Sequence, residues 1–101
     1  MAVEFGVHDE PRLTDLGLAV IGRVMSGAVS VGDVFTQAEG PRRDWTTPSG
    51  AVALVALQVV EINVFRKPVE TVDAGWSAEL VVQGTGADHL HDLVMLRRDE
   101  R

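Results

Sequence analysis

The chain contains no cysteine, and its only lysine is Lys67. Without thiols the protein can form neither a disulfide nor a thiolate metal site, so packing alone must hold its core. The phosphate-binding loop of nucleotide hydrolases ends in Gly-Lys-Ser/Thr, whereas Lys67 lies between Arg66 and Pro68 after an apolar stretch. The sequence therefore argues against nucleotide hydrolysis, and we expect no bound nucleotide.

A long hydrophobic segment is also absent. The longest apolar run covers 51–57 and resumes at Val59 and Val60 after Gln58, which is shorter than the roughly 20 residues of a membrane-spanning helix. The first ten residues carry acids and no basic region followed by an apolar stretch, unlike a signal peptide. We therefore expect a cytoplasmic protein that does not contact a membrane.

Positive charge is scarce, because 9 Lys and Arg stand against 15 Asp and Glu and give a net charge of −6. An acidic surface opposes nonspecific contact with nucleic acid and with anionic membranes, since both are attracted by positive surfaces. We expect no DNA partner, and a basic partner would suit the protein better.

Short alternating apolar stretches separated by turn residues predict strands rather than helices. The predicted strands cover 3–7, 18–25, 34–37, 51–65, 76–82 and 93–96. Gly84 and Gly86 should end the fifth strand, 40–50 should form a long loop, and the tail 97–101 should be flexible. We predict an all-β protein whose single domain, 1–101, is a small closed antiparallel β-barrel of about six strands.

The apolar pattern of the fourth predicted strand changes parity. Val55 and Val59 belong to one face, whereas Val60 and Ile62 belong to the other. A β-bulge between Val59 and Val60 would reverse the face and bend the strand as a small barrel requires.

Three segments together resemble a known family. They are Gly17 to Gly27 closed by Val31-Gly32-Asp33, then Phe65 to Glu70, and finally Ala74-Gly75. In this order they resemble the second domain of the translational GTPases, the β-barrel of elongation factor Tu and its relatives, over about residues 5–96. The resemblance implies that barrel as a stand-alone domain without the GTPase domain.

The resemblance also implies a site. In the family, a glutamate two positions before the aromatic residue helps to form the pocket for the terminal adenosine of aminoacyl-tRNA, and Asn63 stands at that position here. Asparagine can still hydrogen-bond the edge of a base, so Asn63 and the nearby Arg66 are candidate binding residues.

The predicted loop 40–50 carries a second candidate site at Arg42, Arg43 and Trp45. Guanidinium groups beside an aromatic ring hold phosphates and stack bases in proteins that bind single-stranded nucleic acid. The same residue types are enriched at the centres of protein interfaces, and they can also simply pack on their own domain.

The strand 18–25 is apolar on both faces, with Ile21 and Met25 on one of them. A second apolar face suggests cover by a loop of the chain itself, by a second subunit or by a partner.

Trp76 shares its parity with Ala78 and Leu80, which predicts that its ring fills one end of the barrel.

His89 and His91 lie between acidic residues and, on a strand, would project two imidazoles from one face toward a divalent metal ion. The alternative is a polar turn between two strands.

No catalytic triad or acid pair can be assembled, so we expect neither enzyme activity nor a cofactor. The sequence favours a non-catalytic β-barrel module for protein–protein interaction or self-association. The alternative is a translation-associated module that contacts RNA or tRNA.

Overall fold

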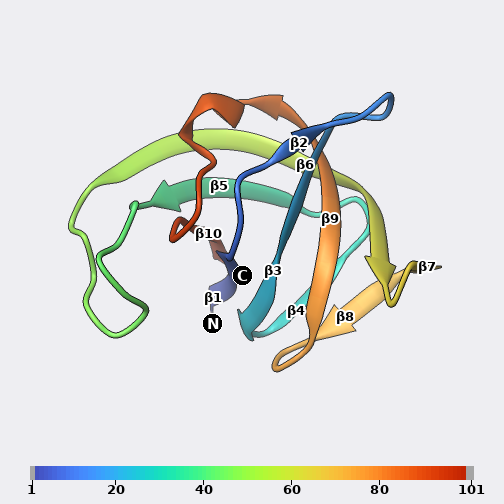
Figure 1. Cartoon of the computed structure of the whole chain (residues 1–101), viewed down its shortest axis with the longest axis horizontal. Coiled ribbons are helices and arrows are strands. Elements are labelled where there is room, and N and C mark those ends of the chain that lie inside the picture. Colours follow the sequence, from blue (N-terminus) through green and yellow to red (C-terminus); the bar gives the residue numbers. More distant parts are fainter. Residues whose placement is uncertain (1, 100–101) are drawn as a thin grey trace.

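The computed structural model describes residues 2–99, and six strands form a closed barrel (Figure 1). They are β1 (Ala2–Val7), β10 (Met95–Asp99), β5 (Val34–Glu39), β6 (Val52–Val64), β9 (Ser77–Thr85) and β3 (Leu18–Ser26), in their order around the barrel. Neighbouring strands pair antiparallel, and β3 pairs back with β1 to complete the circle. The predicted fold is therefore confirmed.

Four shorter strands and one helical turn join these six. They are β2 (Arg12–Leu13), β4 (Ala28–Ser30), β7 (Lys67–Val69), β8 (Thr71–Asp73) and the 3-10 helix η1 (Ala87–His89). β2 pairs with β3, β7 pairs with β6, and β4 and β8 form a separate two-stranded ribbon. The sequence did not predict these strands, because two or three residues are too few to show alternation. Within 2–99 no helix has the length and apolar character needed to span a bilayer.

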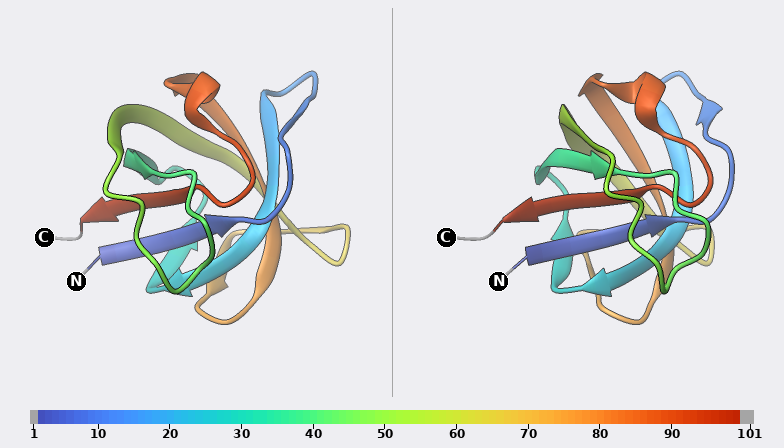
Figure 2. Two further views of the ribbon diagram at one scale, coloured as in Figure 1. Left: turned by 60° about the vertical axis from the view of Figure 1, so that its left-hand side comes forward. Right: turned by 90° about the vertical axis from the view of Figure 1, so that its left-hand side faces the viewer.

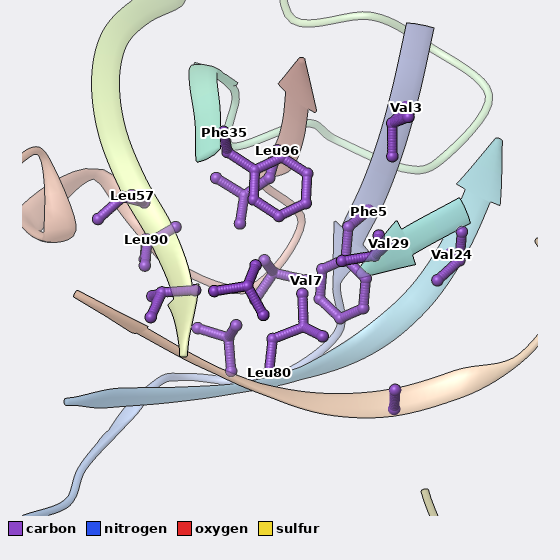
Figure 3. Packing of buried hydrophobic residues seen from close by; sticks show 14 of the residues in the cluster. Val3, Phe5, Val7, Val24, Val29, Phe35, Leu57, Leu80, Leu90 and Leu96 are labelled. Atoms are coloured by element: carbon purple, nitrogen blue, oxygen red, sulfur yellow. The ribbon is translucent and has the colours of Figure 1, made fainter. Parts of the chain in front are cut away.

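The barrel interior is filled by aliphatic side chains around Phe5 and Phe35 (Figure 3). The inward faces of β1, β3, β6 and β9 supply most of them. Val29 of β4 and Val72 of β8 cover one end of the core, and Leu90 joins the core from the segment after η1.

Trp76 does not fill the end of the barrel, contrary to the sequence prediction. β9 begins at Ser77, so Trp76 lies in the preceding turn, where strand alternation does not apply. Its side chain is 53% exposed.

The predicted bulge in β6 is confirmed. The register between β6 and β9 shifts between Val59 and Glu61. Val59 is fully buried before the shift and Ile62 is fully buried after it, so the inward face passes from odd to even positions. The outward positions of the last part of β6 therefore become Glu61 and Asn63.

The C-terminal part differs from the sequence prediction in three ways. Gly84 does not end a strand but lies inside β9, where it takes a φ of 138° close to the Ala56 carbonyl of β6. Leu93 has a φ of 66°, so the last strand begins at Met95. Residues 97–99, expected as a flexible tail, pair with β1, which lies beside β10 (Figure 2). Residues 100–101 lie outside the described range.

The circle closes where β1 crosses β3. Gly6 and Gly22 meet there, and a Cβ atom added to Gly22 would collide with the Gly6 carbonyl oxygen and lie 2.8 Å from Phe5 Cε2. Two backbones can approach so closely only where a side chain is absent.

We predict that Gly22→Ala lowers the free energy of unfolding by about 3 kcal/mol, because a backbone atom must move to admit the methyl group. Gly50→Ala is the control: Gly50 has a φ of 77° but open space around it, so only the conformational cost of about 1 kcal/mol should appear. Urea unfolding measures both. Equal losses would show that the crossing is not tightly packed.

Candidate binding site

Two turns at one end of the barrel enclose a hollow of about 800 Å³. The β6–β7 turn contributes Phe65 and Arg66, and the turn before β9 contributes Trp76. The two aromatic rings meet edge to face, with centroids 6.4 Å apart and planes at 85°. We call this hollow the aromatic groove, and its principal lining residues are Arg12, Ile21, Phe65, Arg66, Trp76 and Glu79.

The β6–β7 turn is strained. Val64 pairs with Lys67, so the connection consists of only Phe65 and Arg66, whose φ angles are 51° and 64°. A two-residue turn with both φ angles positive normally contains Asn-Gly, and an ordinary L-residue there costs about 1 kcal/mol or more. The strained turn holds the Phe65 side chain 84% exposed to solvent.

The floor of the groove is a row of side chains across three neighbouring strands. Ile21 of β3 is in register with Glu79 of β9, which is in register with Asn63 of β6. Glu79 accepts hydrogen bonds from Asn63 Nδ2 and from Arg12 Nη2, both at 3.3 Å. The carboxylate thus joins residues from β2 and β6, and the Asn63 side chain is held in place.

Unpaired positive charge gathers near the groove. Within residues 2–99 four cations form no ion pair, namely Arg23, Arg43, Arg66 and Lys67. Arg66 lines the groove, Lys67 follows it, and Arg23 is in register with Ser77, another lining residue. Arg66 therefore gives the lining of the groove an unpaired cation.

No family model matches the chain, and no curated protein matches it. Among solved structures, the crystal structure of translation elongation factor SelB from Methanococcus maripaludis, in its apo form, matches with a TM-score of 0.70 and 18% sequence identity. The match covers 96% of this chain and 18% of the SelB chain. The fold is that of a translation-factor barrel. The resemblance predicted from the sequence is thereby confirmed for the fold, and a likeness at this identity establishes nothing beyond the fold.

The structure separates the predicted site residues into two groups. Asn63 and Arg66 both line the aromatic groove. Arg42, Arg43 and Trp45 lie in the loop after β5, which is on the left in Figure 1, away from β7 on the right. Only the first pair shares a hollow with exposed aromatic rings.

The loop residues Arg42 and Trp45 are engaged in contacts of their own domain. Trp45 lies over Gly6 of β1, with its Cη2 atom 3.0 Å from where a Gly6 Cβ would be, and its ring centroid is 5.2 Å from that of His8. Arg42 donates to both carboxylate oxygens of Glu39 and to the Trp45 carbonyl oxygen. Only Arg43 of the three remains exposed without a partner.

Glu39 holds both ends of this loop. Its carboxylate binds the Arg42 guanidinium at the start of the loop and accepts a 3.0 Å hydrogen bond from the Ser49 amide near its end. The Glu39 and Arg42 side chains are only 5% and 9% exposed. The Arg42 guanidinium, assisted by Ser49, lowers the pKa of Glu39 against the opposing effect of burial.

His89 and His91 do not lie on a strand. His89 ends η1, and His91 Nδ1 lies 3.3 Å from the Glu10 carboxylate. The strand geometry assumed for a pair of metal-binding imidazoles is therefore wrong. Within residues 2–99, no three His, Asp or Glu side chains gather where they could hold a metal ion.

Ile21 and Met25 remain on the outer face of β3, 51% and 41% exposed, so no loop in the described part of the chain, residues 2–99, covers them. Ile21 lines the aromatic groove, whereas Met25 lies outside it.

Sequence reasoning missed Phe65, Trp76 and Glu79 as groove residues. Phe65 could have been identified from the sequence, because a large aromatic side chain in a tight turn does not reach the core.

We predict that Glu39→Gln lowers the free energy of unfolding by about 2 kcal/mol at neutral pH, because a charged hydrogen-bond acceptor for a buried guanidinium is lost. The folded-state pKa of Glu39 lies below its unfolded value. Its ionised form therefore stabilises the fold above the unfolded pKa, and this contribution disappears as the pH falls through the folded-state pKa. Urea unfolding across pH should show the difference shrinking in acid. Asp15→Asn, an exposed control, should change stability by less than about 0.5 kcal/mol.

We predict that the double substitution Phe65→Asn, Arg66→Gly raises the free energy of unfolding by about 1 kcal/mol, because these residues accept positive φ more readily. Phe65→Ala keeps the backbone strain and should not stabilise. Thermal and urea unfolding compare the variants. A double variant less stable than the original chain would show that the turn is not strained.

Proposed function

We propose that this chain is a non-catalytic binding module that binds a protein through the aromatic groove. The observation that carries the proposal is a pair of exposed rings in edge-to-face contact, Phe65 at the strained two-residue turn and Trp76 in the turn before β9. Strained backbone is retained at functional positions when the surroundings enforce it.

The energetics support an interface. Exposed Phe65, Trp76 and Ile21 lie together at one end of the barrel, and burying them against a partner would release their apolar surface from water. Aromatic and arginine side chains dominate the binding energy of protein interfaces. Arg12 and Arg66 border the same groove. The groove thus combines apolar anchors with a polar rim, as protein interfaces do.

The ionisable groups of the groove favour binding over catalysis. Its only carboxylate is Glu79, which already accepts hydrogen bonds from Arg12 and Asn63. A general base must direct a lone pair at a substrate proton, and both Glu79 oxygens are already engaged by neighbouring side chains. Glu79 therefore serves to position its neighbours.

RNA contact is the second candidate function. Asn63 and Arg66 lie beside two aromatic rings, and such rings stack unpaired bases. The structural neighbour is named as a translation elongation factor. The net charge of −6 and the carboxylate in the groove floor oppose a phosphate chain, so we favour protein.

We predict that Phe65→Ala, Trp76→Ala abolishes capture of a protein partner in an affinity pull-down from the native cell, read by mass spectrometry and RNA sequencing together. Loss of two central aromatic anchors typically weakens binding by 100-fold or more, about 3 kcal/mol. Leu54→Ala is the matched control, because Leu54 is 83% exposed but does not line the groove.

Three other outcomes are informative. Recovery of RNA that the double variant loses would favour the RNA-contacting module. A dimer in sedimentation that the double variant dissociates would identify the partner as a second copy. A protein lost with Leu54→Ala but kept by the double variant would place the interface elsewhere and overturn the proposal.

A further inference from the structure

We propose that the aromatic groove receives a short extended peptide segment with an acidic residue at one end, an apolar residue in the middle and a basic residue at the other end. This inference rests on the proposed function and adds the chemistry of the partner. It follows from the arrangement of charge along the groove.

A second, smaller hollow of about 210 Å³ adjoins the aromatic groove. The two hollows share Arg12, Ile21 and Glu79. The second one ends at Asp9 and Glu10, which lie between β1 and β2. The two adjoining hollows, together called the depression, therefore extend across the sheet from the β6–β7 turn, over β9 and β3, to the segment after β1.

The two ends of this depression carry opposite charges. Arg66 stands at the aromatic end without an ion pair. Asp9 and Glu10 stand at the other end, where Glu10 meets His91 and Asp9 has no cationic partner within residues 2–99. In the middle, Arg12 and Glu79 neutralise one another. A bound segment of complementary charge therefore places an acidic residue beside Arg66 and a basic residue beside Asp9 and Glu10.

Between the charged ends lies the apolar part. Ile21, Phe65 and Trp76 are 51%, 84% and 53% exposed, and all three line the aromatic groove. One aliphatic or aromatic side chain inserted among them would be surrounded from β3, from the β6–β7 turn and from the turn before β9. This contact supplies affinity, and the charged ends set the direction of the segment.

The same charges argue against a nucleic acid strand. Its phosphates repeat one sign along its whole length, so a strand attracted by Arg66 would meet Asp9 and Glu10 at the far end. A peptide can change the sign of its charge within a few residues, each of which advances an extended chain by about 3.3 Å.

The test is fluorescence anisotropy with four labelled peptides of equal length. The first carries two glutamates, a central leucine and two lysines, separated by serines. The second, all-acidic peptide has glutamates in place of the lysines. The third, all-basic peptide has lysines in place of the glutamates. The fourth, the serine peptide, has serine in place of the leucine. We expect the bipolar peptide to bind about fivefold more tightly than either single-sign peptide, and the serine peptide to bind weakest.

Two groove variants locate the charged ends. Arg66→Gly removes the cation and suits the positive φ, so the variant should fold. It should weaken the bipolar peptide severalfold and strengthen the all-basic peptide, because the repulsion between Arg66 and the lysines at that end is lost. Asp9→Lys should weaken the all-basic peptide and strengthen the all-acidic one. Arg43→Ala, which removes an equally unpaired cation from the loop after β5, should change nothing. Circular dichroism confirms that each variant is folded.

Equal affinity for the bipolar and all-acidic peptides, or an effect of Arg43→Ala as large as that of Arg66→Gly, would overturn the inference. Absence of peptide binding at about 1 mM would also overturn it, while the pull-down result would still decide the proposed function independently. Displacement of the bipolar peptide by single-stranded RNA at equal concentration would count against both.

Discussion

The structure depends on closing one sheet on itself, and this requires the backbones of β1 and β3 to approach closely. Gly6 and Gly22 meet at that crossing, where a side chain on Gly22 would collide with the opposite backbone. Closure removes the exposed edges of the main strands and lets their inward side chains share one core. The bulge in β6 adds the bend, so that Val59 and Ile62 both point inward despite their different parity.

A rigid barrel determines where its turns lie. The β6–β7 turn and the turn before β9 are brought together because β6 and β9 are neighbours, with Asn63 in register with Glu79. Neither turn could present a ligand-binding surface alone. Their rings form a T-shaped pair, and the strain at Phe65 and Arg66 is tolerated because the flanking strands are held in register.

The distribution of ion pairs decides which cations remain available to a partner. Glu39 binds Arg42 and the Ser49 amide, so the long loop after β5 is held to its own domain. Asp44 accepts hydrogen bonds from Thr46 and Thr47, which lower its pKa and order the tip of that loop. Within this loop Arg42 and Asp44 bind neighbouring residues, whereas Arg43 is exposed without an ion pair. The other three of the four unpaired cations within residues 2–99 lie at or near the aromatic groove.

The sequence by itself determined the six long strands, the bulge and the barrel class, because alternation of apolar residues is a local property that burial on one face imposes. Through the family resemblance it named Asn63 and Arg66 as candidate binding residues. Both line the aromatic groove, and their role in binding stays a prediction. Only the tertiary structure decided that Trp76 lies outside the core, that Gly84 continues its strand and that Arg42 binds Glu39. These outcomes depend on which residue lies opposite in a neighbouring strand or loop, and such pairings between distant parts of the chain leave no periodic signal in the sequence.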